Sequence, residues 1–204
     1  MRHYNALLLA GLLVAAPASA QNSAPVAPGS SSALTTAPRS DNILDRAINQ
    51  PGTNWTFYGP NKAKAVAAEG VPGGQAVQVT IAAKGANAFD VGAMSPIQKP
   101  IAAGDTILVA VYMRAPKLKA GETTSIPFFG ANEGAAPYET IAANNAQVGP
   151  EWKLYRAAGK ATKAFAAGKA NGTVHLAAAK HVIELGPIFI LDYGPDQDPG
   201  KLIN

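Results

Sequence analysis

The chain of 204 residues contains no cysteine, which excludes a disulfide scaffold, a thiol nucleophile and thiolate metal ligands. Its formal net charge is +4, but the lysines are scattered and do not form the dense basic face of a nucleic-acid-binding protein. A domain without disulfides depends on burial of apolar side chains, so we expect a sizeable core and no nucleic-acid partner.

The first 20 residues have the features of a secretory signal peptide. Arg2 and His3 precede an apolar run over residues 6–16, and Pro17-Ala18-Ser19-Ala20 ends in the small-x-small pattern of a cleavage site. The apolar run is shorter than the roughly 20 residues that span a bilayer, which favours cleavage over a retained anchor. We therefore expect a bacterial periplasmic or secreted protein that is not stably inserted in a membrane after signal removal.

Residues 21–39 (QNSAPVAPGSSSALTTAPR) are rich in Ser, Ala, Pro and Thr and carry a single charge. Such a composition cannot bury enough apolar surface to offset its ordering entropy, so we predict a flexible linker. The folded domain is then expected over residues 40–194, followed by a flexible Gly- and Pro-rich tail over residues 195–204.

Within the domain the apolar pattern has a period of two. In residues 76–81 (AVQVTI) apolar and polar side chains alternate, as in a half-buried strand. Residues 41–49 fit either a short turn of helix or a first strand. Gly- and Pro-rich turn signals separate the strands, which favours an all-β antiparallel sandwich. Further strands are predicted over residues 107–113, 125–129, 152–157, 173–178, 181–185 and 188–193.

The short connection after residues 173–178 predicts a hairpin with the strand over residues 181–185. In that hairpin His175 and His181 would face each other. Two imidazoles without an evident third ligand do not make a zinc site, so packed or surface histidines are the favoured interpretation.

Several short motifs follow one another in a definite order along the domain. They are Asn54-Trp55, Gly73-Gly74 before a strand, Phe89-Asp90, Ile101-x-x-Gly-Asp before a strand ending Met113-Arg114-Ala115, Glu151-Trp152-x-x-Tyr155, Phe165-x-x-Gly168 and the apolar run over residues 182–192. This succession, over about residues 43–194, resembles the carbohydrate-binding modules of the xylan- and cellulose-binding type, which are galactose-binding-like jelly rolls.

The resemblance implies two antiparallel sheets, one of them concave and exposed, across which a polysaccharide or oligosaccharide can lie. It implies a non-catalytic module of the kind usually attached to a glycoside hydrolase or esterase. Aromatic residues make up only 7% of the chain, however, and a sugar platform requires exposed rings. A structural or protein-contact domain with an envelope protein as its partner and no sugar ligand is therefore the alternative.

Aromatic residues and their polar neighbours are the ligand-binding candidates, because sugar faces stack on rings while polar groups bind the hydroxyls. Tyr112 lies on the strand face opposite Val109 and Val111, two residues before Arg114. We therefore expect Tyr112 and Arg114 on the binding face.

Four further candidates come from loop-rich segments and the resemblance. Phe89 and Asp90 occupy a family position that borders the groove, and Tyr138 and Phe129 are candidates for its wall. The indoles Trp55 and Trp152, by contrast, match family positions that pack in the core.

Carboxylates give two further hypotheses. The resemblance implies a structural calcium ion bound by Asp192 at the end of the last strand; the alternative is that Asp192 accepts hydrogen bonds from a turn. Glu184 and Asp192 are the only acidic pair in the apolar C-terminal run. Glycoside hydrolysis requires two carboxyl groups roughly 5–10 Å apart, so an unrecognised glycoside hydrolase or an esterase-associated protein is the third interpretation.

Overall fold

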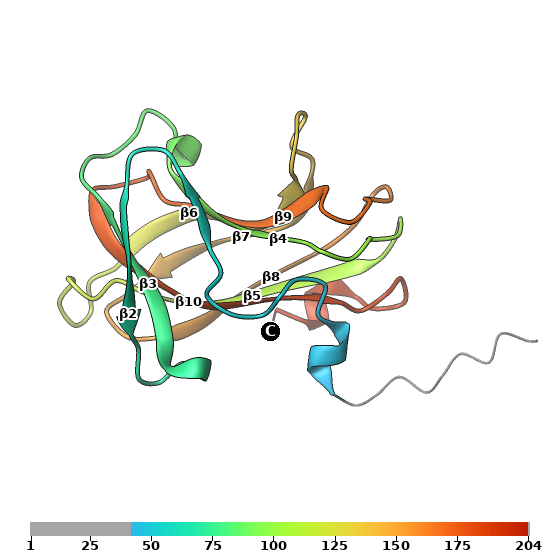
Figure 1. The fold of residues 1–204 in the computed structure, drawn as a ribbon, viewed down its shortest axis with the longest axis horizontal. Coiled ribbons are helices and arrows are strands. Elements are labelled where there is room, and N and C mark those ends of the chain that lie inside the picture. The colour runs from blue at the N-terminus through green and yellow to red at the C-terminus, as the bar shows by residue number, and fades with distance from the viewer. Residues whose placement is uncertain (1–41, 204) are drawn as a thin grey trace, which may run out of the picture. The chain divides into compact units, whose positions relative to one another are not determined.

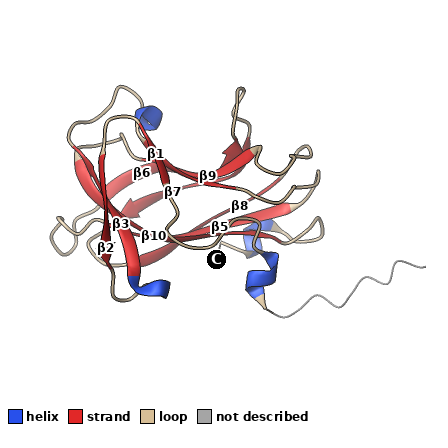
Figure 2. Cartoon of the chain, in the orientation of Figure 1, coloured by secondary structure: helices blue, strands red, loops and turns tan. Residues whose placement is uncertain are grey.

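Two five-stranded antiparallel sheets pack face to face around an apolar core (Figure 1). The structure is a computed structural model that describes residues 42–203. The predicted signal peptide and linker, residues 1–20 and 21–39, lie outside the described residues. Within the described part of the chain, no helix is long and apolar enough to cross a membrane. The predicted all-β sandwich is confirmed (Figure 2).

We call the two layers sheet 1 and sheet 2. Sheet 1 has the order β1 (Thr56–Tyr58), β4 (Gly92–Pro96), β9 (Ala170–His175), β6 (Thr124–Glu133) and β7 (Thr140–Val148). Sheet 2 has the order β2 (Lys62–Ala67), β3 (Gln75–Ile81), β10 (His181–Asp192), β5 (Thr106–Arg114) and β8 (Lys153–Lys160). Short 3-10 helices lie in the connections: η1 (Ile43–Arg46), η2 (Pro72–Gly74), η3 (Ala88–Asp90) and η4 (Pro199–Lys201).

The core forms where the alternating apolar side chains of both sheets meet. Val79 and Ile81 of β3 are buried there, as the alternation predicted. Strands β10 and β5 of sheet 2 are covered on both faces. On the outer face, Leu108 of β5 and Leu191 of β10 belong to a second apolar cluster, against which Tyr193 and Leu202 pack. Residues within 195–204, the tail predicted to be flexible, contact this face of the sheet. Leu202 packs against the second cluster, and the carbonyl of Gln197 accepts a hydrogen bond from the Thr106 hydroxyl.

The predicted hairpin between residues 173–178 and 181–185 is wrong. β9 pairs with β4 and β6 in sheet 1, whereas β10 pairs with β3 and β5 in sheet 2. Leu176 and Ala177 are fully buried where the chain crosses from one sheet to the other. A local pattern does not distinguish this crossing from a hairpin, because pairing is decided by distant strands.

The two strands predicted over residues 181–185 and 188–193 form one strand, β10, with a register shift between Leu185 and Ile188. Gly186 and Pro187 lie in this irregularity, where a residue without an N–H is tolerated. For residues 41–49 the structure has the short helix η1. The edge strand β7 (TIAANNAQV) was not predicted, since Ala and Asn have low strand propensity.

Candidate functional site

A groove of about 800 Å³ lies on the outer face of sheet 1. All five strands of the sheet contribute to it, together with η3 and the connection between β6 and β7. Its lining residues are Tyr58, Phe89, Met94, Phe128, Asn132, Glu133, Gly134, Tyr138, Thr140, Asn171, Thr173 and His175.

The floor of the groove follows from strand alternation and register. Asn171, Thr173 and His175 alternate along β9, and Val174 between them is buried in the core. Met94 of β4 lies directly opposite Thr173, so the two side chains are neighbours on the same face. Local sequence thus decides which residues of each strand face outward, and pairing brings them together.

One end of the groove is aromatic. The imidazole of His175 stacks on the Phe128 ring at a centroid distance of 4.5 Å, and the Phe89 ring meets it edge-on at 6.1 Å. Burial lowers the pKa of His175, which favours the neutral imidazole. Tyr58 lies over Gly92, whose hydrogen leaves room for the ring, and burial raises the pKa of its phenol. These groups are therefore uncharged at neutral pH.

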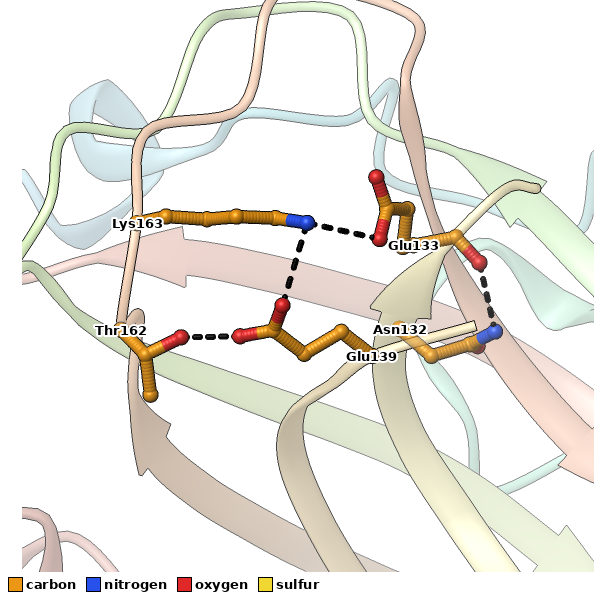
Figure 3. A network of polar contacts seen from close by, with 5 residues as sticks. All are labelled: Asn132, Glu133, Glu139, Thr162 and Lys163. Atoms are coloured by element: carbon orange, nitrogen blue, oxygen red, sulfur yellow. Dashed lines mark hydrogen bonds and ion pairs between the residues drawn. The ribbon is translucent and has the colours of Figure 1, made fainter. Parts of the chain in front are cut away.

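A polar network stands beside Glu133 at the rim of the groove (Figure 3). The Lys163 ammonium lies 2.9 Å from Glu133 Oε2 and 3.1 Å from Glu139 Oε2. The Thr162 hydroxyl donates to Glu139 Oε1. The Thr162 hydrogen bond and then Lys163 lower the pKa of Glu139, and the two carboxylates raise the pKa of Lys163. One cation thus compensates two carboxylates, so the rim has no spare positive charge in this network.

Two polar atoms at the floor of the groove are buried and have no hydrogen-bond partner among residues 42–203. They are Oδ1 of Asn132 and Oγ1 of Thr173. The amide nitrogen of Asn132 is fixed, because it donates to the carbonyl of Glu133 at 2.9 Å. Buried polar atoms are rarely left without a partner, so these two atoms distinguish the floor of the groove from the rest of sheet 1.

Of the residues predicted for ligand binding, the structure brings Phe89 and Tyr138 together on the groove. Both rings are largely exposed, at 57% and 61%. Tyr138 has a φ of 57°, a conformation uncommon outside glycine that clusters at ligand sites. Asp90 does not line the groove. Its carboxylate accepts from the backbone N–H and side-chain amide of Asn87, which supports η3 and hence the loop that carries Phe89.

The structure does not bring Tyr112 and Arg114 into the groove, because β5 belongs to sheet 2. Arg114 Nε lies 2.6 Å from Glu184 Oε2, and its guanidinium lies 4.7 Å from the Trp152 ring centre. Tyr112 packs beside Trp152 in a small apolar cluster on the outer face of that sheet.

Three other aromatic residues pack against the rest of the protein and do not line the groove. The prediction that Phe129 forms the groove wall is wrong, because Phe129 is buried in the core, edge-on to Tyr155. Trp55 is half-buried against the main core and donates to the Gly186 carbonyl at 3.1 Å. Trp152 is half-buried as well, but on the outer face of sheet 2 rather than between the sheets.

The acidic pair Glu184 and Asp192 does not form a hydrolytic site. The two residues are eight positions apart on one strand, roughly 25 Å at about 3.3 Å per residue, well beyond the separation that glycoside hydrolysis requires. Glu184 is buried and structural, since its carboxylate accepts from Gln78 at 2.8 Å and pairs with Arg114.

The expected calcium position lies beside a cavity of about 460 Å³ at the end of β10. Asp192 Oδ1 accepts from the Gly194 N–H at 2.7 Å, which is the predicted turn contact. Among the described residues no group of three acidic or histidine side chains could hold a metal ion. Side chains alone therefore do not provide a calcium site, and backbone carbonyls would have to complete one. The residues lining this cavity include Asp45, Arg46, Lys99, Asp105 and Asp192.

His175 and His181 lie in different sheets and do not meet. The ring of His181 bridges two segments, because Nε2 bonds the carbonyl of Leu176 and Nδ1 bonds the Thr124 hydroxyl, both at 2.8 Å. A carbonyl only accepts, so Nε2 carries the proton and Nδ1 accepts from Thr124. Both ring nitrogens of His181 are therefore engaged in hydrogen bonds that connect two segments of the chain, and neither is left to bind a metal ion.

Comparison of the sequence with family models and with curated proteins gives no match. Solved structures with a similar fold include one described as "CBM4 structure and function", with a TM-score of 0.52 and 15% identity over 68% of this chain and 94% of that one. Another holds the CBM22-1 and GH10 modules of Clostridium thermocellum xylanase 10B with xylohexaose; the TM-score is 0.52 and the identity 17%, over 76% of this chain and 30% of that one.

An arabinose-bound α-L-arabinofuranosidase also matches, with a TM-score of 0.52 and 14% identity over 74% of this chain. This chain spans only 26% of the arabinofuranosidase and 30% of the xylanase structure. It therefore matches part of each enzyme but nearly all of the CBM4 structure. The chain has the β-sandwich fold of carbohydrate-binding modules, as the order of its motifs predicted.

Proposed function

We propose that this chain is a non-catalytic, exported module that binds an uncharged polysaccharide in the groove of sheet 1. The observation that carries the proposal is the pairing of a ring cluster with polar atoms that have no partner among residues 42–203. Phe89, Phe128 and His175 form the cluster, and Thr173 and Asn132 supply the atoms. The fold shared with carbohydrate-binding modules, one of them in a structure with xylohexaose, supports the same ligand class.

The chemistry of the groove suits a sugar chain. The C–H faces of a pyranose pack on aromatic rings, and its hydroxyls both donate and accept hydrogen bonds. Oδ1 of Asn132 is an acceptor, and the Thr173 hydroxyl can donate as well as accept. The groove is not enclosed and receives residues from all five strands of sheet 1, which fits a chain segment better than a small metabolite enclosed on all sides.

The charges around the groove favour a neutral glycan. Glu133 is the single charged side chain among the groove-lining residues, and Lys163 is held between Glu133 and Glu139. An anionic polysaccharide would meet two carboxylates and one already-engaged cation at this rim. Binding of a neutral chain should therefore show little dependence on ionic strength.

Affinity electrophoresis tests the proposal directly. The protein from residue 21 onwards is run in gels containing soluble xylans, glucans or mannans, with polygalacturonate as the anionic comparison. We expect retardation by at least one neutral polymer and none by polygalacturonate. Failure of every neutral polymer to retard the protein would overturn the proposal and favour a structural or protein-contact domain, which capture of a stoichiometric envelope partner would then establish.

A further inference from the structure

A second hollow, of about 370 Å³, lies at the edge of sheet 1 where β1 begins and β4 ends. Its walls are uncharged and mix polar with apolar groups: three side-chain amides, two hydroxyl groups, one indole and one proline ring. No hydrogen-bond partner within residues 42–203 engages the side chains of Gln50, Asn54 or Gln98. The lining residues are Gln50, Asn54, Trp55, Thr56, Ser95, Pro96 and Gln98.

The base of this hollow is held in place by buried contacts. Ser95 is 3% exposed and its hydroxyl accepts from the Asn49 amide at 3.3 Å. Asn49 is itself fixed to β10, because its amide donates to the Ile188 carbonyl and its Oδ1 accepts from the Ile190 N–H. The Ser95 proton has no acceptor among the described residues, so this hydroxyl remains a donor for a molecule in the hollow.

The walls are fixed as well. The Gln98 N–H donates to the Ile48 carbonyl at 2.7 Å, and Gly52 exchanges backbone hydrogen bonds with Ile188. Trp55 is held by its indole N–H, which donates to Gly186. A site whose backbone is already ordered loses less entropy when it binds a ligand.

The hollow adjoins the groove through two directly paired positions. Thr56 lines the hollow and lies opposite Met94, which lines the groove. Pro96 lines the hollow and lies opposite Asn171, which also lines the groove. Side chains directly opposite each other in a sheet lie about 5 Å apart, so Thr56 and Pro96 bring the rim of the hollow next to the groove.

We propose that the hollow is a further subsite for the same uncharged glycan, in which Gln50, Asn54 and Gln98 bind the hydroxyls of sugar units beyond the groove. The inference rests on the proposed function, because it assigns the hollow the same ligand. Amides that both donate and accept match the mixed character of sugar hydroxyls, and the lack of charge excludes a strong site for an ion.

Calorimetry with an oligosaccharide series tests the subsite. Oligomers of the retarding polymer, from disaccharide to octasaccharide, are titrated into the wild type and into the double variant Asn54→Ala/Gln98→Ala. Both side chains are exposed and lack partners within residues 42–203, so the variant should fold normally, as circular dichroism can verify. The matched control is Gln75→Ala, an exposed glutamine on β3 of sheet 2.

We expect affinity to rise with the length of the oligosaccharide. For the double variant this rise should stop at a shorter oligosaccharide than for the wild type. The longest oligomers should then bind the double variant roughly tenfold more weakly, and the shortest should bind both proteins equally. In the wild type, the side-chain amide signals of Asn54 and Gln98 should shift in NMR spectra with long oligomers only.

Equal affinities of wild type and double variant for every length would overturn the subsite and leave the groove as the binding site. Weaker binding of the shortest oligomers by the double variant would also overturn it, because the hollow would then belong to the primary site. Failure of the wild type to bind any oligomer or polymer would overturn the proposed function itself.

Discussion

The imidazole ring of His175 lies face to face with the ring of Phe128, with their planes inclined by 27°. These residues come from neighbouring strands of sheet 1, β9 and β6. Phe89 of η3 is the third member of this ring cluster. Because burial lowers the pKa of His175, the cluster behaves as an uncharged surface. It forms the aromatic end of the groove in which we propose that a sugar chain binds.

The first prediction concerns this ring cluster. Phe89→Ala should weaken polysaccharide binding roughly tenfold, a loss of about 1.4 kcal/mol, because an exposed stacking surface is removed. Calorimetry with the retarding polymer measures the effect. The matched control is Tyr112→Ala, an aromatic truncation on the outer face of sheet 2. If Tyr112→Ala weakened binding and Phe89→Ala did not, the site would lie on sheet 2.

The second prediction concerns the pair between Arg114 and Glu184. Arg114→Ala should lower the free energy of unfolding by about 2 kcal/mol, because it leaves a buried carboxylate without its cation. Urea unfolding measures this loss. The double variant Arg114→Ala/Glu184→Gln should recover part of it, since the unpaired charge is gone. A double variant no more stable than the single one would contradict this explanation.

The third prediction concerns pH and His181. Burial lowers its pKa from the ordinary 6.5, so the unfolded chain binds a proton more readily than the folded one. The free energy of unfolding should therefore fall as the pH drops below 6.5 through the lower folded-state value, with His175 contributing in the same direction. Protonation also removes the Nδ1 acceptor of the Thr124 hydroxyl.

Urea unfolding at pH 7.5 and pH 5.5 measures this dependence. His181→Gln should reduce the difference between the two pH values, because an amide does not titrate in this range. An unchanged difference in the variant would show that other groups cause the loss.

The fourth prediction concerns calcium. We propose, from the resemblance alone, that an ion binds beside Asp192 with backbone oxygens completing its shell. Calcium should then raise the midpoint of thermal unfolding relative to a chelator, and Asp192→Asn should abolish the difference. Equal midpoints for the wild type with calcium and with chelator would contradict a calcium site at Asp192.

Strand alternation was the most informative feature of the sequence. It correctly identified the buried face of β3, because the apolar and polar side chains of a half-buried strand alternate with a period of two. Phe129, rather than Phe128, was a candidate for the groove wall, because it belongs to a segment that the sequence marks as loop-rich. A register shift between Ile126 and Phe129 reverses the outward and inward faces, so Phe128 reaches the groove and Phe129 the core. Pro127 lies inside this shift, and a proline within a strand is a sequence signal of such an irregularity.

Other groove residues were missed because their neighbours are distant in the chain. Thr173 and Asn132 lie on neighbouring strands of the groove floor only because β9 pairs with β6 in sheet 1. His175 was interpreted as packed or at the surface, and its ring partners Phe89 and Phe128 lie far from it in sequence. Ring clusters of this kind follow from strand order, which single-sequence patterns do not contain.

The amino-acid sequence by itself determined that this chain builds short antiparallel strands around an apolar core, and the order of its motifs indicated the type of sandwich. Only the tertiary structure decided that Phe89 and Tyr138 share a groove while Tyr112 and Arg114 lie on the opposite sheet. The physical reason is that alternation assigns a side chain to one face of its own strand, whereas hydrogen bonding to distant strands assigns that strand to a sheet.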